Sequence, residues 1–329
     1  RNFLISIFAP IIFLVAIFCF PQIAKASNNL PLGSAPKYIT KVGTDLYIAN
    51  SASSNVSVVD TTTNTVTDTI NVGAGPSFSV LAGTDLYVTN TTANTVSVID
   101  TTTNTVTDTI AVGTGPVFAN LVGTDLYILN NGGSDVSVID TSTNTVSATI
   151  TVGTNPWSGT LVGTDLYVTN TGSNDVKVIN TLTETVTATI AVGVHPRFTT
   201  LIGTDLYVIN RFSNSVKIIN TLTNTVTATI AVQTGPLIGY LVGTDFYVNN
   251  FNDNEISVIS TISHTVTATI TVGFNPRFST LIGTDLYVMN QSSGTISIID
   301  TISKTLSNTI LNLGSQPFDI ILNGTDLYI

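Results

Sequence analysis

The sequence predicts an all-β fold built from repeats, and three observations carry this prediction. The string Gly-Thr-Asp-(Leu/Phe)-Tyr recurs along the 329-residue chain, with its tyrosine at positions 47, 87, 127, 167, 207, 247, 287 and 328. Val, Ile, Thr and Tyr, which favour strands, dominate every repeat. No window of useful length shows the 3.6-residue apolar period of a helix. Four short strands in each unit of about 40 residues are typical of β-propeller blades.

The unit from Pro116 to Gly153 shows the expected plan of one blade. It contains four apolar or alternating segments, at 116–122, 126–129, 136–140 and 145–152, and polar or glycine-containing turns separate them. In the last segment Val146, Ala148, Ile150 and Val152 alternate with Thr and Ser. This period of two predicts an outer strand with one dry face and one wet face.

The second strand of each unit carries a recognisable motif. The string Tyr-Val-Thr-Asn occurs at Tyr87–Asn90 and Tyr167–Asn170. Variants occur at Tyr47–Asn50, Tyr127–Asn130, Tyr207–Asn210, Tyr247–Asn250 and Tyr287–Asn290. With the Val-Ser-Val-Ile-Asp strand and the Gly-x-x-Pro join, the sequence over residues 30–329 resembles the YVTN β-propeller repeat family of bacterial and archaeal surface proteins. The resemblance implies a propeller fold and a surface protein, but it says little about activity, because one fold hosts many functions.

The number of blades is open at this stage. Seven complete units begin at Pro36, Pro76, Pro116, Pro156, Pro196, Pro236 and Pro276, and Pro317 to Ile329 adds two strands of an eighth. The segment Leu30–Gly33 resembles the end of an outermost strand, which would complete the last blade and close the ring. The family resemblance favours seven blades, whereas a chain that continues beyond Ile329 favours eight. We expect a single propeller domain over residues 27–329, truncated at its C-terminus.

The first 26 residues have the composition of a targeting segment. Arg1 precedes an apolar run from Phe3 to Phe20, and Ala24-Lys25-Ala26 matches a cleavage site. We therefore predict a signal peptide and a secreted, extracellular or cell-surface protein, with the periplasm as a further option. The 18-residue run also reaches the lower limit of a membrane span, so an uncleaved anchor is the alternative, and the only membrane contact that we expect.

Composition excludes several function classes. Charged residues make up 9% of the chain and the net charge is −10, which argues against a coiled coil, a charge-rich disordered chain or a nucleic-acid-binding protein. Without residues 1–26, eight basic and 20 acidic residues remain, for a net charge of −12, and no cysteine remains. Two His and two Glu offer few acids, bases or metal ligands. We expect no enzyme, no cofactor and no metal site; the alternative is an extracellular hydrolase or lactonase with one metal in the central channel.

Residues that recur in every blade are expected to serve the blade. An Asn ends the second strand of all seven complete units, and we predict an Asx turn in which its side chain bonds the backbone of the next loop. The alternative is a ring of amides that binds a ligand. We expect the recurring tyrosine to pack, with its hydroxyl near a blade edge.

Residues that differ between blades are better candidates for a site. The joins between blades and the loops after each second strand are expected on one face, where binding residues usually lie. The arginines beyond residue 26, the only Trp and two loop phenylalanines map to that face: Trp157, Arg197, Arg211, Phe212, Phe251 and Arg277. We predict a binding site there for a protein or glycan at the cell surface, because Trp and Arg are enriched at binding hot spots. The alternative is that these positions differ between blades only because surface loops tolerate substitution. Phe274 maps to the same face.

Overall fold

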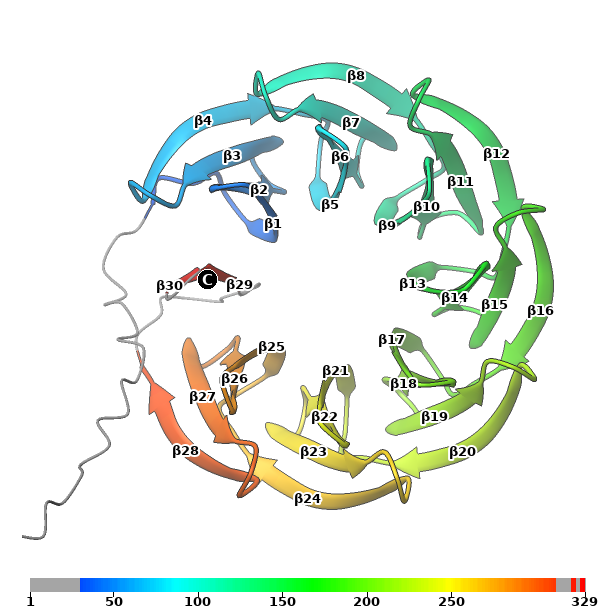
Figure 1. Ribbon diagram of the computed structural model, residues 1–329, viewed down its shortest axis with the longest axis vertical. Coiled ribbons are helices and arrows are strands. Elements are labelled where there is room, and N and C mark those ends of the chain that lie inside the picture. The colour runs from blue at the N-terminus through cyan, green and yellow to red at the C-terminus, as the bar shows by residue number, and fades with distance from the viewer. Residues whose placement is uncertain (1–29, 312–320, 324–325, 329) are drawn as a thin grey trace, which may run out of the picture.

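The computed structural model describes residues 30–311, 321–323 and 326–328. The predicted targeting segment, residues 1–26, lies outside the described residues. In the described part of the chain, strands form seven four-stranded sheets and one two-stranded sheet, and no helix capable of spanning a membrane occurs. The sheets stand side by side in a ring, as blades of a propeller (Figure 1). The predicted all-β propeller is confirmed.

Each four-stranded blade runs in chain order from an innermost to an outermost antiparallel strand. The innermost strands are β1 (Pro36–Val42), β5 (Pro76–Ala82), β9 (Pro116–Val122), β13 (Pro156–Val162), β17 (Pro196–Ile202), β21 (Pro236–Val242) and β25 (Pro276–Ile282). The second strands are β2 (Asp45–Asn50), β6 (Asp85–Asn90), β10 (Asp125–Asn130), β14 (Asp165–Asn170), β18 (Asp205–Asn210), β22 (Asp245–Asn250) and β26 (Asp285–Asn290).

The outer half of each blade repeats equally regularly. The third strands are β3 (Asn55–Asp60), β7 (Thr95–Asp100), β11 (Asp135–Asp140), β15 (Asp175–Asn180), β19 (Ser215–Asn220), β23 (Glu255–Ser260) and β27 (Thr295–Asp300). The outermost strands are β4 (Thr65–Asn71), β8 (Thr105–Ala111), β12 (Thr145–Thr151), β16 (Thr185–Ala191), β20 (Thr225–Ala231), β24 (Thr265–Thr271) and β28 (Thr305–Ile310). The pairing of each third strand with its outermost strand contains an irregularity, as between Val138 and Ile139, and such bulges increase the local twist.

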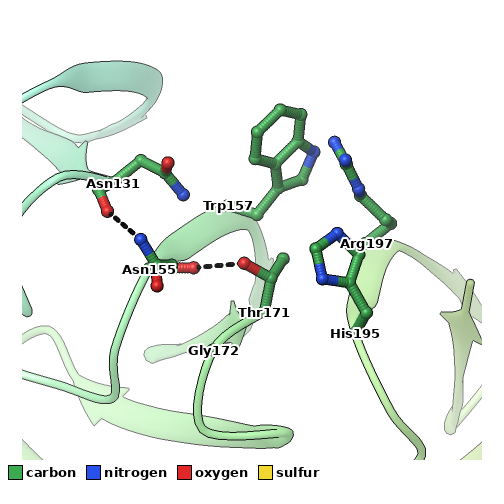
Figure 2. Close-up of a pocket in the computed structure, with 7 residues that line it drawn as sticks. All are labelled: Asn131, Asn155, Trp157, Thr171, Gly172, His195 and Arg197. Atoms are coloured by element: carbon green, nitrogen blue, oxygen red, sulfur yellow. Dashed lines mark hydrogen bonds between the residues drawn. The ribbon is translucent and has the colours of Figure 1, made fainter. Parts of the chain in front are cut away.

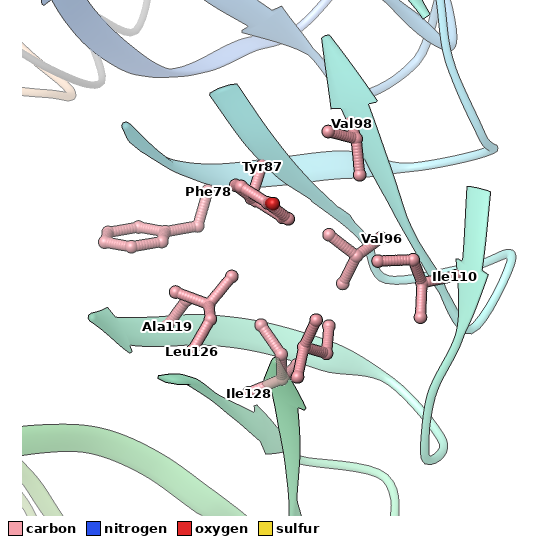
Figure 3. Close-up of a cluster of buried hydrophobic side chains, with 9 residues drawn as sticks. Phe78, Tyr87, Val96, Val98, Ile110, Ala119, Leu126 and Ile128 are labelled. Atoms are coloured by element: carbon pink, nitrogen blue, oxygen red, sulfur yellow. The ribbon is translucent and has the colours of Figure 1, made fainter. Parts of the chain in front are cut away.

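The core lies between neighbouring blades. In one such layer Phe78, Tyr87 and Val96 of the second blade pack against Leu126 and Ile128 of the third (Figure 3). The outermost strands lie along the rim of the ring (Figure 1). The dry face predicted for the outer strand is therefore incomplete, since Ile150 is 6% exposed but Val146 is 37% exposed. Each blade is stabilised mainly by apolar burial against its neighbours.

The two-stranded sheet, β29 (Ile321–Asn323) and β30 (Asp326–Tyr328), lies in the ring between β1 and β25 (Figure 1). Tyr328 packs against Leu46 and Ile48 of the first blade, together with Leu30 and Leu32. Leu30 and Leu32 take the place that Ile150 and Val152 have against the fourth blade. The N-terminal segment thus packs with the partial eighth blade, as expected from its likeness to the end of an outermost strand.

Candidate functional site

The ring has two faces that differ in their loops. On the first, which we call the join face, the loops from each second strand to the third hydrogen-bond to the joins between blades. Arg211 N, for example, donates to His195 O over 3.0 Å, and Phe212 N donates to Val194 O over 3.1 Å. On the opposite face, which we call the turn face, the turn between the third and outermost strands of each blade bonds to the turn between its first and second strands, as Thr61 N does to Thr44 O. This arrangement confirms that joins and second-strand loops share a face.

All six residues of the predicted site lie on the join face. Trp157, Arg197 and Arg277 follow the join prolines at the start of β13, β17 and β25, whereas Arg211, Phe212 and Phe251 stand in second-strand loops. The structure brings them together in two groups. Arg197 contacts Trp157, and Arg211 lies between Phe212 and Phe251. Arg277 contacts Phe278 instead, and it donates a hydrogen bond from Nη1 to Gln291 Oε1 over 3.3 Å.

Arg197 and Trp157 form the closest cation–π contact among the described residues. The guanidinium carbon lies 3.8 Å from the centroid of the Trp157 ring. The backbone positions this contact, because the Arg197 carbonyl accepts hydrogen bonds from Ser158 Oγ (2.7 Å) and Thr169 Oγ1 (2.8 Å) of the preceding blade. Ser158 directly follows Trp157 in β13, so these bonds hold the start of β17 beside the tryptophan.

A cavity of about 360 Å³ opens beside this pair. Its lining residues come from three consecutive blades and their joins: Asn131, Asn155, Trp157, Thr171, Gly172, His195 and Arg197. Figure 2 shows the indole of Trp157 and the side chains of Arg197 and His195 on one side, and the asparagines on the other. Gly172 has no room for a side chain, since a Cβ there would lie 2.6 Å from Asn155 Oδ1.

The asparagines are held in place by backbone carbonyls. Asn131 Nδ2 donates to Pro156 O over 3.0 Å, and Asn155 Nδ2 donates to Asn131 O over 2.7 Å. Thr171 Oγ1 in turn donates to Asn155 O over 3.0 Å. Each amide retains one N–H and a carbonyl oxygen, so this wall of the cavity offers both donors and acceptors.

A second aromatic group joins the cavity to Arg211. The His195 ring stacks on Phe212 with centroids 4.4 Å apart. The Arg211 guanidinium carbon lies 5.7 Å from the Phe212 ring and 5.6 Å from the Phe251 ring. His195 has φ 59°, at a join position where the other blades have Ala, Gly or Asn, as in Asn155 and Asn275. Histidine is among the residues that are enriched in this region of backbone conformation, and its ring is held by the stacking on Phe212.

Arg197 and Arg211 carry positive charge on the join face without an ion pair to a described carboxylate. Burial, with the charges of Arg211 and Arg277, lowers the pKa of Arg197 to about 10. Burial also lowers the pKa of His195 to about 4, with further contributions from Arg197 and Arg211, so His195 is neutral at pH 7. Among the described residues, no Asp or Glu makes an ion pair with Arg197 or Arg211 within 4.0 Å.

Carboxylates do occur on this face, and two of them are engaged in hydrogen bonds with neighbouring loop residues. Asp175 accepts hydrogen bonds from Asn170 Nδ2 and Ser173 Oγ, and Asp253 accepts one from the backbone N–H of Thr234. The positive charge of Arg197 and Arg211 therefore remains available to an anionic group from outside.

The Asn that ends each second strand is structural, although its contacts differ from the predicted Asx turn. Asn130, which is fully buried, donates from Nδ2 to Asp135 Oδ1 (2.6 Å) and Ser137 Oγ (2.9 Å) of the adjacent β11. Bonds to a third-strand Ser recur at Asn50, Asn90, Asn250 and Asn290. The Asn side chain bonds the third strand because the second strand, which it ends, finishes inside the sheet and not in a solvated loop.

The structure adds residues that the sequence did not indicate. The repeat pattern assigns no site role to His195, Asn131, Asn155 or Thr171. At the join position of Asn155 and His195 three other blades have Gly, which was a visible signal, but only the packing of three blades shows that these residues share a cavity. Within the described residues, no group of three or more His, Cys, Asp or Glu side chains is placed to hold a metal ion.

Comparisons with known proteins bear on the fold. No protein-family model and no curated protein matches the sequence. Among solved structures, the chain is similar to hydrazine synthase of Kuenenia stuttgartiensis, with a TM-score of 0.64 and 20% identity over 83% of this chain and 97% of that one. It is also similar to BamB from Moraxella catarrhalis (TM-score 0.70, 12% identity, 89% and 90% covered) and to AztD from Citrobacter koseri (0.64, 10%, 87% and 88%). At these identities the likeness shows the fold alone, and that fold is a β-propeller.

Proposed function

We propose that this protein is an exported, non-catalytic β-propeller that binds an anionic group of a cell-surface protein or glycan through its join face. One observation carries the proposal: the Arg197 guanidinium carbon lies 3.8 Å from the centroid of the Trp157 ring, beside a cavity and without a described carboxylate partner. In a chain of net charge −10, such a group is where the local potential can turn positive.

The rigidity of the scaffold supports a binding role. The Arg197 carbonyl is held by two hydroxyls, and the Arg211 loop is bonded to the join at His195. Binding residues on a rigid scaffold lose little conformational entropy when a partner docks, and Trp and Arg supply a large share of binding energy in interfaces.

Export and the YVTN assignment belong to the same proposal. The basic start, apolar run and Ala24-Lys25-Ala26 site support a secretory signal, and the repeated Tyr-Val-Thr-Asn motif supports kinship with YVTN surface proteins. N-terminal sequencing of the protein recovered from the envelope or medium tests export. A mature terminus at residue 27 is expected, whereas retention of Arg1 on a membrane-bound protein would indicate an anchor.

The binding role is tested with soluble polymers on the full-length protein. Poly-L-glutamate and dextran sulfate are expected to bind, and uncharged dextran is expected not to bind. The double variant Arg197→Ala/Arg211→Ala should lose polyanion binding. The matched variant Lys177→Ala/Lys217→Ala removes the same amount of charge from the third strands β15 and β19. This variant should retain polyanion binding. An equal loss in both variants would mean that net charge alone governs binding, and absence of polyanion binding by the wild type would end the proposal.

The competing function is an extracellular enzyme with one metal in the centre of the ring. Elemental analysis of the purified protein distinguishes the two. A stoichiometric transition metal that survives dialysis, and whose removal abolishes a hydrolytic activity, would favour the enzyme.

A further inference from the structure

We propose that the cavity between Trp157, Arg197 and Asn131 is a subsite for a carboxylated pyranose, a sugar ring of the hexuronate class. This inference rests on the proposed binding function and names the ligand chemistry of one part of the join face. Two opposed walls of the cavity carry it, one cationic and one built from amides and a hydroxyl.

The cationic wall suits a carboxylate. The Arg197 guanidinium carbon lies 3.8 Å from the centroid of the Trp157 ring, and no described carboxylate pairs with it, so its N–H groups can serve a ligand. A planar guanidinium edge matches the two oxygens of a carboxylate, and such charge-assisted bonds are about twice as strong as neutral ones. His195 beside it is neutral at pH 7, because its pKa is lowered to about 4, and Arg197 is therefore the main charge in the cavity.

The opposite wall suits hydroxyl groups. Asn131 and Asn155 are each fixed by one hydrogen bond to a backbone carbonyl, and each keeps an N–H and an Oδ1. A primary amide can donate to one hydroxyl of a sugar and accept from its neighbour. With an inorganic anion bound at Arg197, the free N–H and Oδ1 groups of Asn131 and Asn155 would hydrogen-bond only to water. A sugar ring with a carboxylate can bind both walls at once.

The size of the cavity fits one ring. About 360 Å³ lies at the lower end of the range for small-molecule sites, which is roughly 300–1,000 Å³. Gly172, where a side chain would clash with Asn155 and Thr154, keeps part of this space open.

Trp157 is the only tryptophan of the chain, so its fluorescence reports on this cavity directly. The full-length protein is titrated with galacturonate and glucuronate, with galactose and glucose as uncharged counterparts, and with sodium sulfate as a free anion. The uronates are expected to change Trp157 emission in a saturable way, and their affinity should exceed that of the neutral sugars and of sulfate by about tenfold or more, as expected for a charge-assisted pair.

Variants then assign the two walls. Arg197→Gln should reduce uronate affinity by about tenfold, and Arg197→Lys, which keeps the charge without the planar fork, should restore only part of it. Asn131→Ala/Asn155→Ala should reduce the preference for uronate over sulfate. Lys177→Gln is the control for charge. Calorimetry repeats each titration, and circular dichroism with thermal unfolding establishes that each variant folds.

Three outcomes would overturn the subsite. These are equal affinity for sulfate and uronate, uronate binding that leaves Trp157 emission unchanged, and uronate affinity unaffected by Arg197→Gln in a folded variant. If poly-L-glutamate still binds in an Arg197- and Arg211-dependent way while uronates do not, the subsite assignment fails and the proposed binding function stands. If neither binds, both fail.

Discussion

The Tyr328 hydroxyl donates a hydrogen bond to Asn64 Oδ1 over 2.5 Å, although 264 residues separate them in the chain. The same bond joins consecutive blades elsewhere, since Tyr47 donates to Asn104 and Tyr87 to Asn144, each over 2.6 Å. Tyr328 therefore binds the first blade as a tyrosine of the preceding blade would. The two strands β29 and β30 occupy the eighth place in the ring, and the packing of Leu30 and Leu32 beside Tyr328 agrees with this placement.

The tyrosine–asparagine bond predicts a stabilising substitution. Glu184 stands where four other blades have Asn, with φ 54°, and the one hydrogen bond of the Tyr127 hydroxyl to a described residue across that interface is to the Thr181 carbonyl. Glu184→Asn restores the missing acceptor and suits this backbone conformation better, so the free energy of unfolding should rise by about 1 kcal/mol. Urea unfolding measures it. Asn144→Ala, which removes the acceptor of Tyr87, should lower stability by a similar amount, and an unchanged value in both variants would contradict the role of this bond.

The buried tyrosines predict a cooperative loss of stability in alkali. Burial, with smaller contributions from nearby carboxylates, raises the pKa of six blade tyrosines to about 12: Tyr47, Tyr87, Tyr127, Tyr167, Tyr207 and Tyr247. Unfolded tyrosines ionise near pH 10, so the unfolded chain releases protons first. The stabilisation is complete below pH 10 and is lost as the pH rises toward 12. Tyrosinate absorbance and circular dichroism should therefore change together, and ionisation of these tyrosines in a folded protein would refute the expectation.

The lowered pKa of His195 predicts a contribution to the free energy of unfolding that is lost in acid. Its folded-state pKa of about 4 lies below the ordinary value of 6.5, so the unfolded chain binds the proton first as the pH falls. The contribution is present above pH 6.5 and is lost between pH 6.5 and 4. His195→Asn, the residue type found at Asn155 and Asn275, should flatten the stability profile in that window. NMR titration of the ring gives the pKa, and a value near 6.5 would show that the ring is solvated.

Replacing the arginines of the join face should affect polyanion binding and the free energy of unfolding to different extents. Arg197→Ala and Arg277→Ala are each expected to weaken poly-L-glutamate binding by about 1–3 kcal/mol. Arg197→Ala should also lower the free energy of unfolding by about 0.5–1 kcal/mol, because it removes the cation–π contact with Trp157. Calorimetry and urea unfolding separate the two effects. Binding unchanged in the double variant, with loss on mutating the turn face, would place the site on the other side of the ring.

Four aliphatic side chains on the turn face predict a change in surface properties without a change in stability. Leu182, Leu222, Ile262 and Ile302 occupy the turns between the third and the outermost strands of the fourth to seventh blades and are 78–79% exposed. The first two blades carry Thr62 and Thr102 there. Replacing all four by Thr should reduce binding of an apolar dye, while each change alters stability by no more than about 0.5 kcal/mol, as for exposed sites. A large loss of stability would show that these side chains are packed.

Much of the architecture was predictable from local patterns. The period of 40 residues, the alternation within 145–152 and the turn residues predicted four strands per blade, and in the Pro116–Gly153 unit the observed strands β9 to β12 agree within a residue. Strand formation depends on such local preferences, and similar repeats bury equivalent faces. The strands predicted for one unit therefore apply to the other units. The placement of Trp157, Arg197 and Arg211 on one face followed from the same plan.

The contacts between blades could not be read from the sequence. Arg197 and Trp157 are 40 residues apart, and only the packing of β17 against β13 brings the guanidinium within 3.8 Å of the indole. The cavity joins Asn131 to His195 for the same reason, and the tyrosine hydroxyl meets the turn of the next blade 57 residues later. The sequence by itself therefore determined the repeat, its strands and the face on which variable residues lie. Tertiary structure alone decided which side chains touch and that the eighth place in the ring is occupied, because these contacts depend on the rotation from one blade to the next.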